Sequence, residues 1–230
     1  MKKYILFKLV FIISFTINIT ASAQVNKLLL GVKGGVNLSN MNGNFFKDKS
    51  WIAGFNAGLR IDYLLTERLY IRSGLELTNK GVKEDRIETI NENKGTIDAT
   101  TRLLYLQIPV HAAYKLNLNQ TTKLVLYGGP FLAYGINGKR KTEITSEKPS
   151  EELNKYKIDF FGEKGFTKRL DMGLGGGIGL EYQNFGIETG YDFGLINIIE
   201  DITMIGENGT TPLNIKAKTM NAYASLTYRF

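Results

Sequence analysis

The residues of this chain that could support catalysis are few. The 230-residue sequence contains one histidine, His111, and no cysteine. Without cysteine, the sequence has no thiolate metal site, disulfide or cysteine nucleophile. His111 lies near Gln107 and Lys115 on the polar face of an alternating segment, where it could act as a general base. A histidine in that setting is more often a hydrogen-bonded interior residue. We therefore predict no enzymatic activity and keep an enzyme that uses His111 as the third alternative.

Two pairs of carboxylates have a spacing that could serve acid–base chemistry. Glu188 and Asp192 share one face of a segment, and Asp171 and Glu181 share a face of the preceding one. Such pairs act in glycosidases and aspartic dyads, but structural ion pairs also bring carboxylates together. We predict the structural role, with these partners: Arg60, Arg72 and Arg229.

The glycine-rich run at 173–179, GLGGGIG, has the glycine spacing of a dinucleotide-binding turn. That motif requires a strand before it and a helix after it, within a βαβ unit. No such unit surrounds the run, and no metal-ligand spacing occurs elsewhere. We therefore predict no cofactor and no metal.

The N-terminus predicts export. Residues 1–23 combine a basic start, an apolar run and Ala21-Ser22-Ala23 as a cleavage motif, which together are typical of a signal peptide. The mature chain is expected to span 24–230 with 26 basic and 22 acidic residues. This balance is too mild to indicate nucleic acid binding.

Beyond residue 24 the dominant pattern is alternation with period 2, which predicts strands with one apolar face. The clearest example is AGFNAGLRIDYLL at 53–65. Eight strands are predicted, at 28–38, 53–65, 68–82, 101–116, 122–137, 169–182, 184–198 and 220–230. Pro109 and Pro130 fall inside two of them, and each is expected to mark a bulge or bend because proline lacks a backbone donor.

The connections alternate in length, as in an up-and-down antiparallel barrel of an outer membrane. The short connections are Leu65–Arg68, Asn117–Thr121 and Gln183–Asn184. The long connections are Ser39–Ile52, Lys83–Thr100, Gly138–Lys168 and Ile199–Leu213. We therefore predict an all-β, eight-stranded transmembrane barrel in one domain, with the short turns in the periplasm and the long loops outside.

The composition of the polar face decides which face is interior. A soluble lipocalin-like barrel would turn its apolar face inward, whereas a membrane barrel turns it toward lipid. The polar face carries many glycines, which make room inside a narrow barrel, namely Gly31, Gly35, Gly54, Gly58, Gly74, Gly173, Gly175, Gly177, Gly179, Gly186, Gly190 and Gly194. The same face carries a charge-balanced set that suits an enclosed ion-pair network, namely Lys33, Arg60, Asp62, Arg72, Glu76, Lys115, Arg169, Asp171, Glu181, Glu188, Asp192 and Arg229. This distribution favours the membrane barrel.

Aromatic residues are placed consistently with a membrane barrel. A girdle at the periplasmic headgroup level is predicted from residues on the apolar face beside short turns, namely Tyr63, Tyr114, Tyr182, Phe185, Tyr228 and Phe230. A second group lies in long loops, where it could form either a docking surface for a partner or an upper lipid girdle, namely Phe45, Phe46, Trp51, Phe160, Phe161 and Phe166.

Several motifs resemble the PorT-like (porin-family) outer membrane protein β-barrel domain family of Bacteroidota. They are GVKGGVNLS at 31–39, SGLELTNKG at 73–81, YLQIPV at 105–110, GGPFLAYG at 128–135, MGLGGGIGLEY at 172–182 and LTYRF at 226–230. The resemblance implies an eight-stranded barrel in the bacterial outer membrane. It also implies that the final aromatic residue, Phe230, is read by the barrel-assembly machinery.

The predicted function is that of a structural or interaction scaffold with a plugged lumen. An eight-stranded barrel is just wide enough for its interior side chains to fill, and the balanced charge does not select one ion sign. Expected partners are outer-membrane lipids and lipopolysaccharide, whose phosphates the basic run Lys139-Arg140-Lys141 could meet, and a protein at the long loops. The main alternative is a porin or channel for small solutes.

Overall fold

The fold is an all-β barrel, seen here in a computed structural model that describes residues 27–90, 93–146, 154–161, 167–200, 202–206 and 209–230. The predicted signal peptide lies outside these residues. Eight strands form the barrel: β1 (Leu28–Gly43), β3 (Ile52–Leu64), β4 (Leu69–Ile90), β5 (Asn93–Asn117), β6 (Thr122–Ser146), β8 (Leu170–Tyr182), β9 (Phe185–Gly194) and β12 (Ala217–Arg229). Four shorter strands lie outside the ring: β2 (Lys49–Ser50), β7 (Asn154–Asp159), β10 (Ile202–Gly206) and β11 (Gly209–Leu213).

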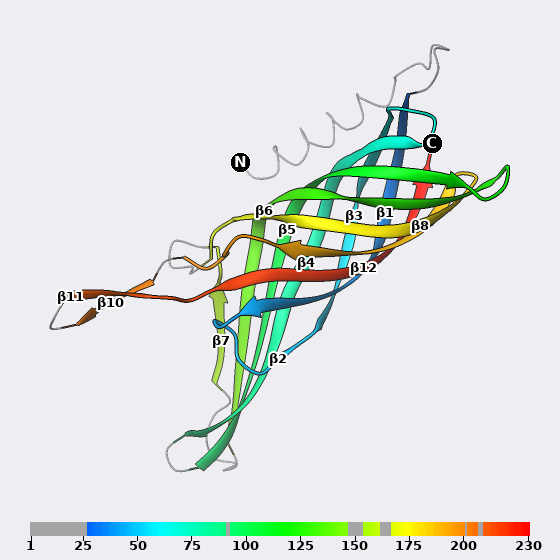
Figure 1. The fold of residues 1–230 in the computed structure, drawn as a ribbon. Coiled ribbons are helices and arrows are strands. Elements are labelled where there is room, and N and C mark those ends of the chain that lie inside the picture. Colours follow the sequence, from blue (N-terminus) through cyan, green and yellow to red (C-terminus); the bar gives the residue numbers. More distant parts are fainter. Residues whose placement is uncertain (1–26, 91–92, 147–153, 162–166, 201, 207–208) are drawn as a thin grey trace, which may run out of the picture.

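The ring is antiparallel and follows the order of the chain. Each barrel strand pairs with the next, and β12 pairs with β1 from Gly31–Arg229 to Gly43–Ala217 (Figure 1). This closure leaves no free edge among the eight strands, which a membrane requires because lipid offers no hydrogen-bond partners to a bare sheet edge. The predicted eight-stranded up-and-down barrel is therefore confirmed.

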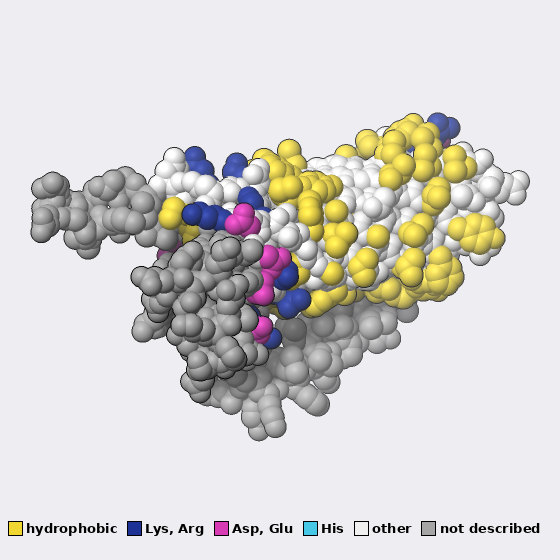
Figure 2. All heavy atoms as spheres, turned by 90° about the horizontal axis from the view of Figure 1, so that it is seen from below, with side chains coloured by type: hydrophobic (Ala, Val, Ile, Leu, Met, Phe, Trp, Pro, Cys, Tyr) yellow, Lys and Arg dark blue, Asp and Glu magenta, His cyan; other side chains and the backbone are white. Residues whose placement is uncertain are grey.

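The two faces of the wall are inverted relative to those of a soluble protein. Large apolar side chains point outward, as at Val36, Phe55 and Leu226, where 64%, 49% and 68% of the side-chain surface is exposed. Charged side chains such as Asp62 and Lys115 are buried in the lumen. Figure 2 shows hydrophobic side chains spread over the outer wall, while most charged side chains gather toward one end. The soluble-barrel alternative requires the opposite arrangement. In the described part of the chain, no helix is long and apolar enough to span a membrane.

All four predicted long loops contain strand residues, and in two of them the barrel strands continue far into the loop. The segment 83–100 was expected to be a loop, but β4 continues to Ile90 and β5 begins at Asn93. Strand β6 likewise continues to Ser146, and β7 pairs with its far end. Figure 1 shows β4, β5 and β6 extending well beyond the other strands. The sequence of this stretch, KEDRIETI at 83–90 and NKGTIDAT at 93–100, lacks the strict apolar alternation that identifies a half-buried strand. We call this extension, formed by β2, β7 and the far ends of β4, β5 and β6, the blade.

The strand pairing is interrupted at Pro109 and Pro130, as expected, but no extra residue is inserted there. The register of β5 against β6 is the same on both sides of the prolines, although the residue pairs beside Pro130 are not hydrogen-bonded. The register shifts instead between Leu104 and Tyr105, where β6 contains one extra residue, Ile136. A bulge of this kind reverses which residues of the strand face inward. Beyond Ile136, the odd-numbered residues of β6 therefore turn outward.

Candidate functional site

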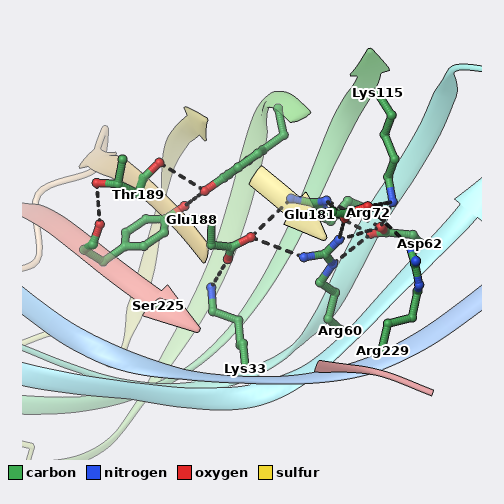
Figure 3. A network of polar contacts seen from close by, with 12 residues as sticks. Lys33, Arg60, Asp62, Arg72, Lys115, Glu181, Glu188, Thr189, Ser225 and Arg229 are labelled. Carbon is green, nitrogen blue, oxygen red and sulfur yellow. Dashed lines mark hydrogen bonds and ion pairs between the residues drawn. The ribbon is translucent and has the colours of Figure 1, made fainter. Parts of the chain in front are cut away.

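The lumen holds a balanced set of ionised side chains. Six cations and six carboxylates lie inside the described part of the barrel: Lys33, Arg60, Arg72, Lys80, Lys115 and Arg229, with Asp62, Glu76, Asp171, Glu181, Glu188 and Asp192. Eleven of the twelve charged residues predicted for the interior are among them, and the exception is Arg169. We call the ion-paired members of this set the lumen network (Figure 3).

Asp62 is the most connected carboxylate near the short-turn end. It accepts hydrogen bonds from Arg60 Nη2 at 2.9 Å, Arg72 Nε at 3.0 Å and Lys115 Nζ at 2.8 Å. These donors come from β3, β4 and β5, so one carboxylate joins three neighbouring strands on the inside. A buried carboxylate with three charged donors is well compensated for the loss of its hydration.

Glu181 on β8 extends the lumen network across the barrel. It pairs with Arg60, with Lys115 at 3.1 Å and with Arg229 Nη1 at 3.2 Å. Because Arg60 and Lys115 also contact Asp62, the two carboxylates share their cations. Strands on opposite sides of the lumen are thus held by one continuous cluster.

Glu188 on β9 forms the next layer. Its two oxygens pair with Lys33 at 3.1 Å, Arg72 at 3.3 Å and Arg60 at 3.4 Å. Lys33 also pairs with Glu76 at 3.1 Å. Figure 3 shows these side chains converging from strands that face one another across the lumen. The interior is therefore crossed by ion pairs at this level.

The Asp192 side chain lies in the lumen and forms no ion pair with a described residue. It accepts a hydrogen bond from Gln107 Nε2 at 3.1 Å, and among the described residues no cation pairs with it. It was expected to pair with an arginine, but the arginines lie nearer the short turns. Asp192 therefore differs in its surroundings from the other lumen carboxylates.

Lys80 is a lumen residue that the sequence reading missed, and Arg169 was wrongly included. Lys80 Nζ pairs with Asp171 Oδ2 at 3.2 Å, and both side chains are fully buried. Arg169 precedes β8, is exposed, and donates to the carbonyl oxygens of Gly135 and Phe161. Lys80 and Glu76 are both even-numbered residues of β4, so the period of two places them on the same face. This pattern could have identified Lys80 as a lumen residue. Arg169 is two residues before Asp171 and would share its face in a longer strand, but it lies just before the start of β8.

Aromatic rings fill the middle of the lumen. Tyr127 and Tyr223 meet through their hydroxyls at 3.1 Å. Their rings occupy the space that a side chain would take at Gly177 and Gly190. The guanidinium of Arg72 lies 4.7 Å from the centre of the Tyr127 ring. Each glycine thus makes room for the tyrosine directly opposite it on the neighbouring strand, as the glycine-rich polar face led us to expect.

His111 is buried in this aromatic layer. Its ring stacks on Tyr127 with centroids 5.7 Å apart, and its Nε2 atom has no hydrogen-bond partner in the structure. A cavity of about 20 Å³ lies beside it, bordered also by Gln107 and Asp192. This volume has room for about one water molecule and none for a substrate. The arrangement does not support catalysis by His111.

The end of the lumen farthest from the short turns is closed by an apolar cluster, which we call the cap. Phe46, Phe160 and Phe161 are 3%, 2% and 6% exposed. They pack with Met41, Val82, Leu103, Tyr105, Phe131, Ala133, Ile198, Ile199 and Ala217. The prediction that these three phenylalanines are exposed was wrong, because they fold inward over the barrel.

The remaining loop aromatics divide between two settings. Phe45 is partly buried against the cap, and its ring meets Phe46 edge-on at 4.7 Å. Trp51 is 47% exposed and lies at the base of the blade between β2 and β3. Phe166 lies outside the described residues. Of this group, Trp51 alone is shown to be available at the surface.

The predicted girdle residues gather at the opposite end of the barrel. All six are exposed on the outer wall beside the short turns: Tyr63, Tyr114, Tyr182, Phe185, Tyr228 and Phe230. Phe230 is the most exposed of them, at 74%. Phe185 and Tyr228 pack edge-on at 5.1 Å, and Tyr228 and Phe230 at 5.6 Å. No set of three or more His, Asp or Glu residues that could hold a metal occurs in the described part of the chain.

An apolar outer wall, a closed ring of strands and a polar plugged lumen define an integral outer-membrane β-barrel. The comparison with protein families agrees: residues 21–200 match the outer membrane protein beta-barrel domain. The chain belongs to this family, and it resides in the outer membrane. A search of curated proteins finds no match.

Several solved structures are similar to this chain at low sequence identity. Neisserial surface protein A is 12% identical over 87% of this chain and 97% of its own, with a TM-score of 0.39. Ail of Yersinia pestis, solved in complex with the heparin analogue sucrose octasulfate, is 15% identical over 89% and 99%, with a TM-score of 0.40. The outer membrane protease OmpT of Escherichia coli is 10% identical over 92% and 99%, with a TM-score of 0.44.

Proposed function

We propose that this protein is a non-conducting outer-membrane scaffold that presents its blade to a protein partner outside the cell. On its motifs, we assign it to the PorT-like members of its family. The observation that carries the proposal is the double closure of the lumen. The lumen network crosses the barrel from Lys115 to Glu76, and the cap covers the end beneath the blade.

The closure leaves little space for a solute. The cavity between Lys33, His111 and Tyr223 has a volume of about 20 Å³, and the one beside Arg229 about 10 Å³. Hydrated ions need wider passages than these. The balanced charge also gives neither anions nor cations a preferred route, which argues against the small-solute channel.

The strands that form the blade are longer than a membrane-crossing strand has to be. Strands β4, β5 and β6 have 22, 25 and 25 residues, whereas a tilted crossing strand needs about 9–11. The excess of about 11–16 residues corresponds to roughly 35–55 Å of strand at about 3.3 Å per residue. In this proposal the outward aromatic group at the short turns, including Tyr114 and Phe185, anchors the other end in the headgroup layer.

The first experiment tests whether the lumen conducts. Purified protein reconstituted in planar lipid bilayers is expected to give no stable single-channel current at 1 M KCl. Reproducible, ion-selective current steps would overturn the plugged scaffold and support the channel instead. A variant with the cap weakened, Phe160→Ala with Phe161→Ala, measures whether the lumen network alone keeps the barrel closed.

The second experiment tests the blade as the binding element. Asp85 and Asp98 pair directly across β4 and β5, so Asn-Gly in place of residues 86–97 shortens the hairpin without changing its register.

A photo-crosslinking amino acid in place of Trp51 reports contact with the partner on intact cells. Asn-Gly in place of Gln183-Asn184, the two-residue turn between β8 and β9, is the matched control. We expect one discrete protein adduct in the native chain and the control, and its loss in the shortened blade. An adduct unchanged by the shortening contradicts the proposal.

A further inference from the structure

A groove on the outer wall gathers three cations at the base of the blade. It has a volume of about 250 Å³ and is bordered by Arg102, Lys139, Lys141, Asn79, Asn137 and Leu104. Arg102 lies directly opposite Lys139 in the β5–β6 ladder, and Lys141 is opposite Thr100, one layer farther from the membrane. Like charges placed opposite each other on a sheet repel, so this arrangement is unfavourable without an anion.

The three cations of this groove form no ion pair within the described part of the chain, although Asp159 of β7 lies opposite Lys139 in the β6–β7 ladder. Among the residues that the structure describes, no carboxylate forms an ion pair with Arg102, Lys139 or Lys141. Neighbouring cations differ: Arg140 pairs with Glu84 at 2.7 Å, and Lys83 pairs with Asp85 at 2.8 Å. The groove therefore gathers three cations, of which Arg102 and Lys141 have no acidic residue directly opposite them in the β5–β6 and β6–β7 ladders.

The bulge at Ile136 creates this arrangement. Before it, even-numbered residues of β6 face outward, as Leu132, Tyr134 and Ile136 do at 47%, 52% and 44% exposure. After it, Lys139 and Lys141 face outward and Arg140 turns inward toward Glu84. The expectation that Lys139, Arg140 and Lys141 act together was therefore wrong for Arg140, whose place is taken by Arg102 of the neighbouring strand.

The groove lies where the outer wall changes from apolar to charged. Along β6 the outward side chains pass from Tyr134 and Ile136 to Asn137 and Lys139 within four residues. This is the level at which acyl chains end and lipid headgroups begin. A ligand seated here can place an anionic group among the cations and its hydrocarbon against the apolar wall below.

We propose that this groove binds the phosphate of a phosphorylated glycolipid in the outer leaflet. A guanidinium binds phosphate through two parallel hydrogen bonds, while lysine ammonium groups act as point charges. The Asn79 and Asn137 side chains can donate to sugar hydroxyls at the rim. The groove is smaller than the roughly 300–1,000 Å³ of a pocket for a drug-sized molecule, which suits a headgroup whose acyl chains stay in the bilayer. The proposal is independent of the partner at the blade.

The test compares lipid retention by matched variants. The variant R102Q/K139Q/K141Q removes the three groove cations, and the control R68Q/K123Q/K27Q removes the same charge at the short-turn end, where these side chains form no ion pair in the described chain. Each protein is reconstituted in phosphatidylcholine nanodiscs containing diphosphoryl lipid A. Bound lipid is then counted by native mass spectrometry. Folding of each variant is checked by heat-modifiable gel mobility.

We expect lipid A to be retained by the native chain and the control. Its apparent affinity for the groove variant should fall at least about tenfold, because one charge-assisted hydrogen bond accounts for about that factor. Dephosphorylated lipid A should bind the native chain as weakly as diphosphoryl lipid A binds the groove variant. Equal retention by all three proteins overturns the proposal. Displacement of lipid A by millimolar inorganic phosphate also overturns it, since the groove would then bind free phosphate rather than a lipid.

Discussion

Lys80 on β4 and Asp171 on β8 form an ion pair with a distance of 3.2 Å that is fully buried beneath the cap. The Lys80 ammonium also lies 4.3 Å from the centre of the Phe131 ring, and Asp171 accepts a hydrogen bond from Thr219 Oγ1 at 2.7 Å. The pair thus joins strands from opposite sides of the barrel at the boundary between polar lumen and apolar cap.

Removing one partner of this pair should destabilise the barrel strongly. Lys80→Met leaves the Asp171 carboxylate without its cation, and we expect the free energy of unfolding to fall by about 3–5 kcal/mol. Urea unfolding in lipid vesicles, followed by heat-modifiable gel mobility, measures this change. Lys80→Met combined with Asp171→Asn should recover most of the loss. Lys83→Met, at an exposed ion pair, should show no measurable change, and an equal loss there would contradict the prediction.

The carboxylates of the lumen should differ in how much each contributes to the stability of the barrel. Asp62 receives hydrogen bonds from three cations, so Asp62→Asn should cost about 3–5 kcal/mol by leaving buried positive charge uncompensated. Asp192 accepts only from Gln107 among the described groups, and Asp192→Asn should cost about 1 kcal/mol or less. The same vesicle unfolding assay ranks the two variants, and the reverse order would argue against the lumen network as the main lock.

The stability of the cap should depend on the close packing of the Phe161 ring against Gly135. The Phe161 ring occupies the space of any side chain at Gly135, so Gly135→Ala should cost about 1–3 kcal/mol. Gly128, on the same strand, has its nearest neighbour at 3.5 Å from an added Cβ, and Gly128→Ala is the matched control. In a double-mutant cycle, Phe161→Leu should relieve part of the Gly135→Ala cost. Strictly additive effects would show that the ring does not pack as described.

The blade should show a paired carboxylate titration. Lys83 donates a hydrogen bond to Asp85 and thereby lowers the pKa of Asp85 below its ordinary value of 3.8, whereas a hydrogen bond shared with Asp85 raises the pKa of Asp98. The folded blade thus binds a proton at Asp98 more tightly than the unfolded chain, and this contribution to stability is lost as the pH rises through the raised pKa. The Asp85 contribution has the opposite sign and is lost as the pH falls. NMR titration of ¹³C-labelled Asp carboxyls should show the two midpoints on opposite sides of 3.8. Asp85→Asn should change the Asp98 midpoint, and an unchanged midpoint would contradict the coupling.

The strands and their orientation could be predicted from sequence because a half-buried strand has a strict period of two. Segment 53–65 shows this directly: Phe55 and Leu59 face lipid, and Arg60 and Asp62 share the lumen. The far ends of β4 and β5 could not be predicted in this way. The sequence there is mostly polar and has no period of two, so the backbone pairing of these strands leaves no pattern of hydrophobicity.

The sequence by itself determined that this chain is a closed, eight-stranded membrane barrel with a charge-balanced interior. Alternation, glycine placement and the equal numbers of opposite charges depend on residue types alone. The tertiary structure decided which charges meet, that Phe160 and Phe161 fold inward, and that Lys139 faces outward while Arg140 faces Glu84. These outcomes depend on contacts between distant strands and on a single extra residue, Ile136, which reverses the two faces of β6.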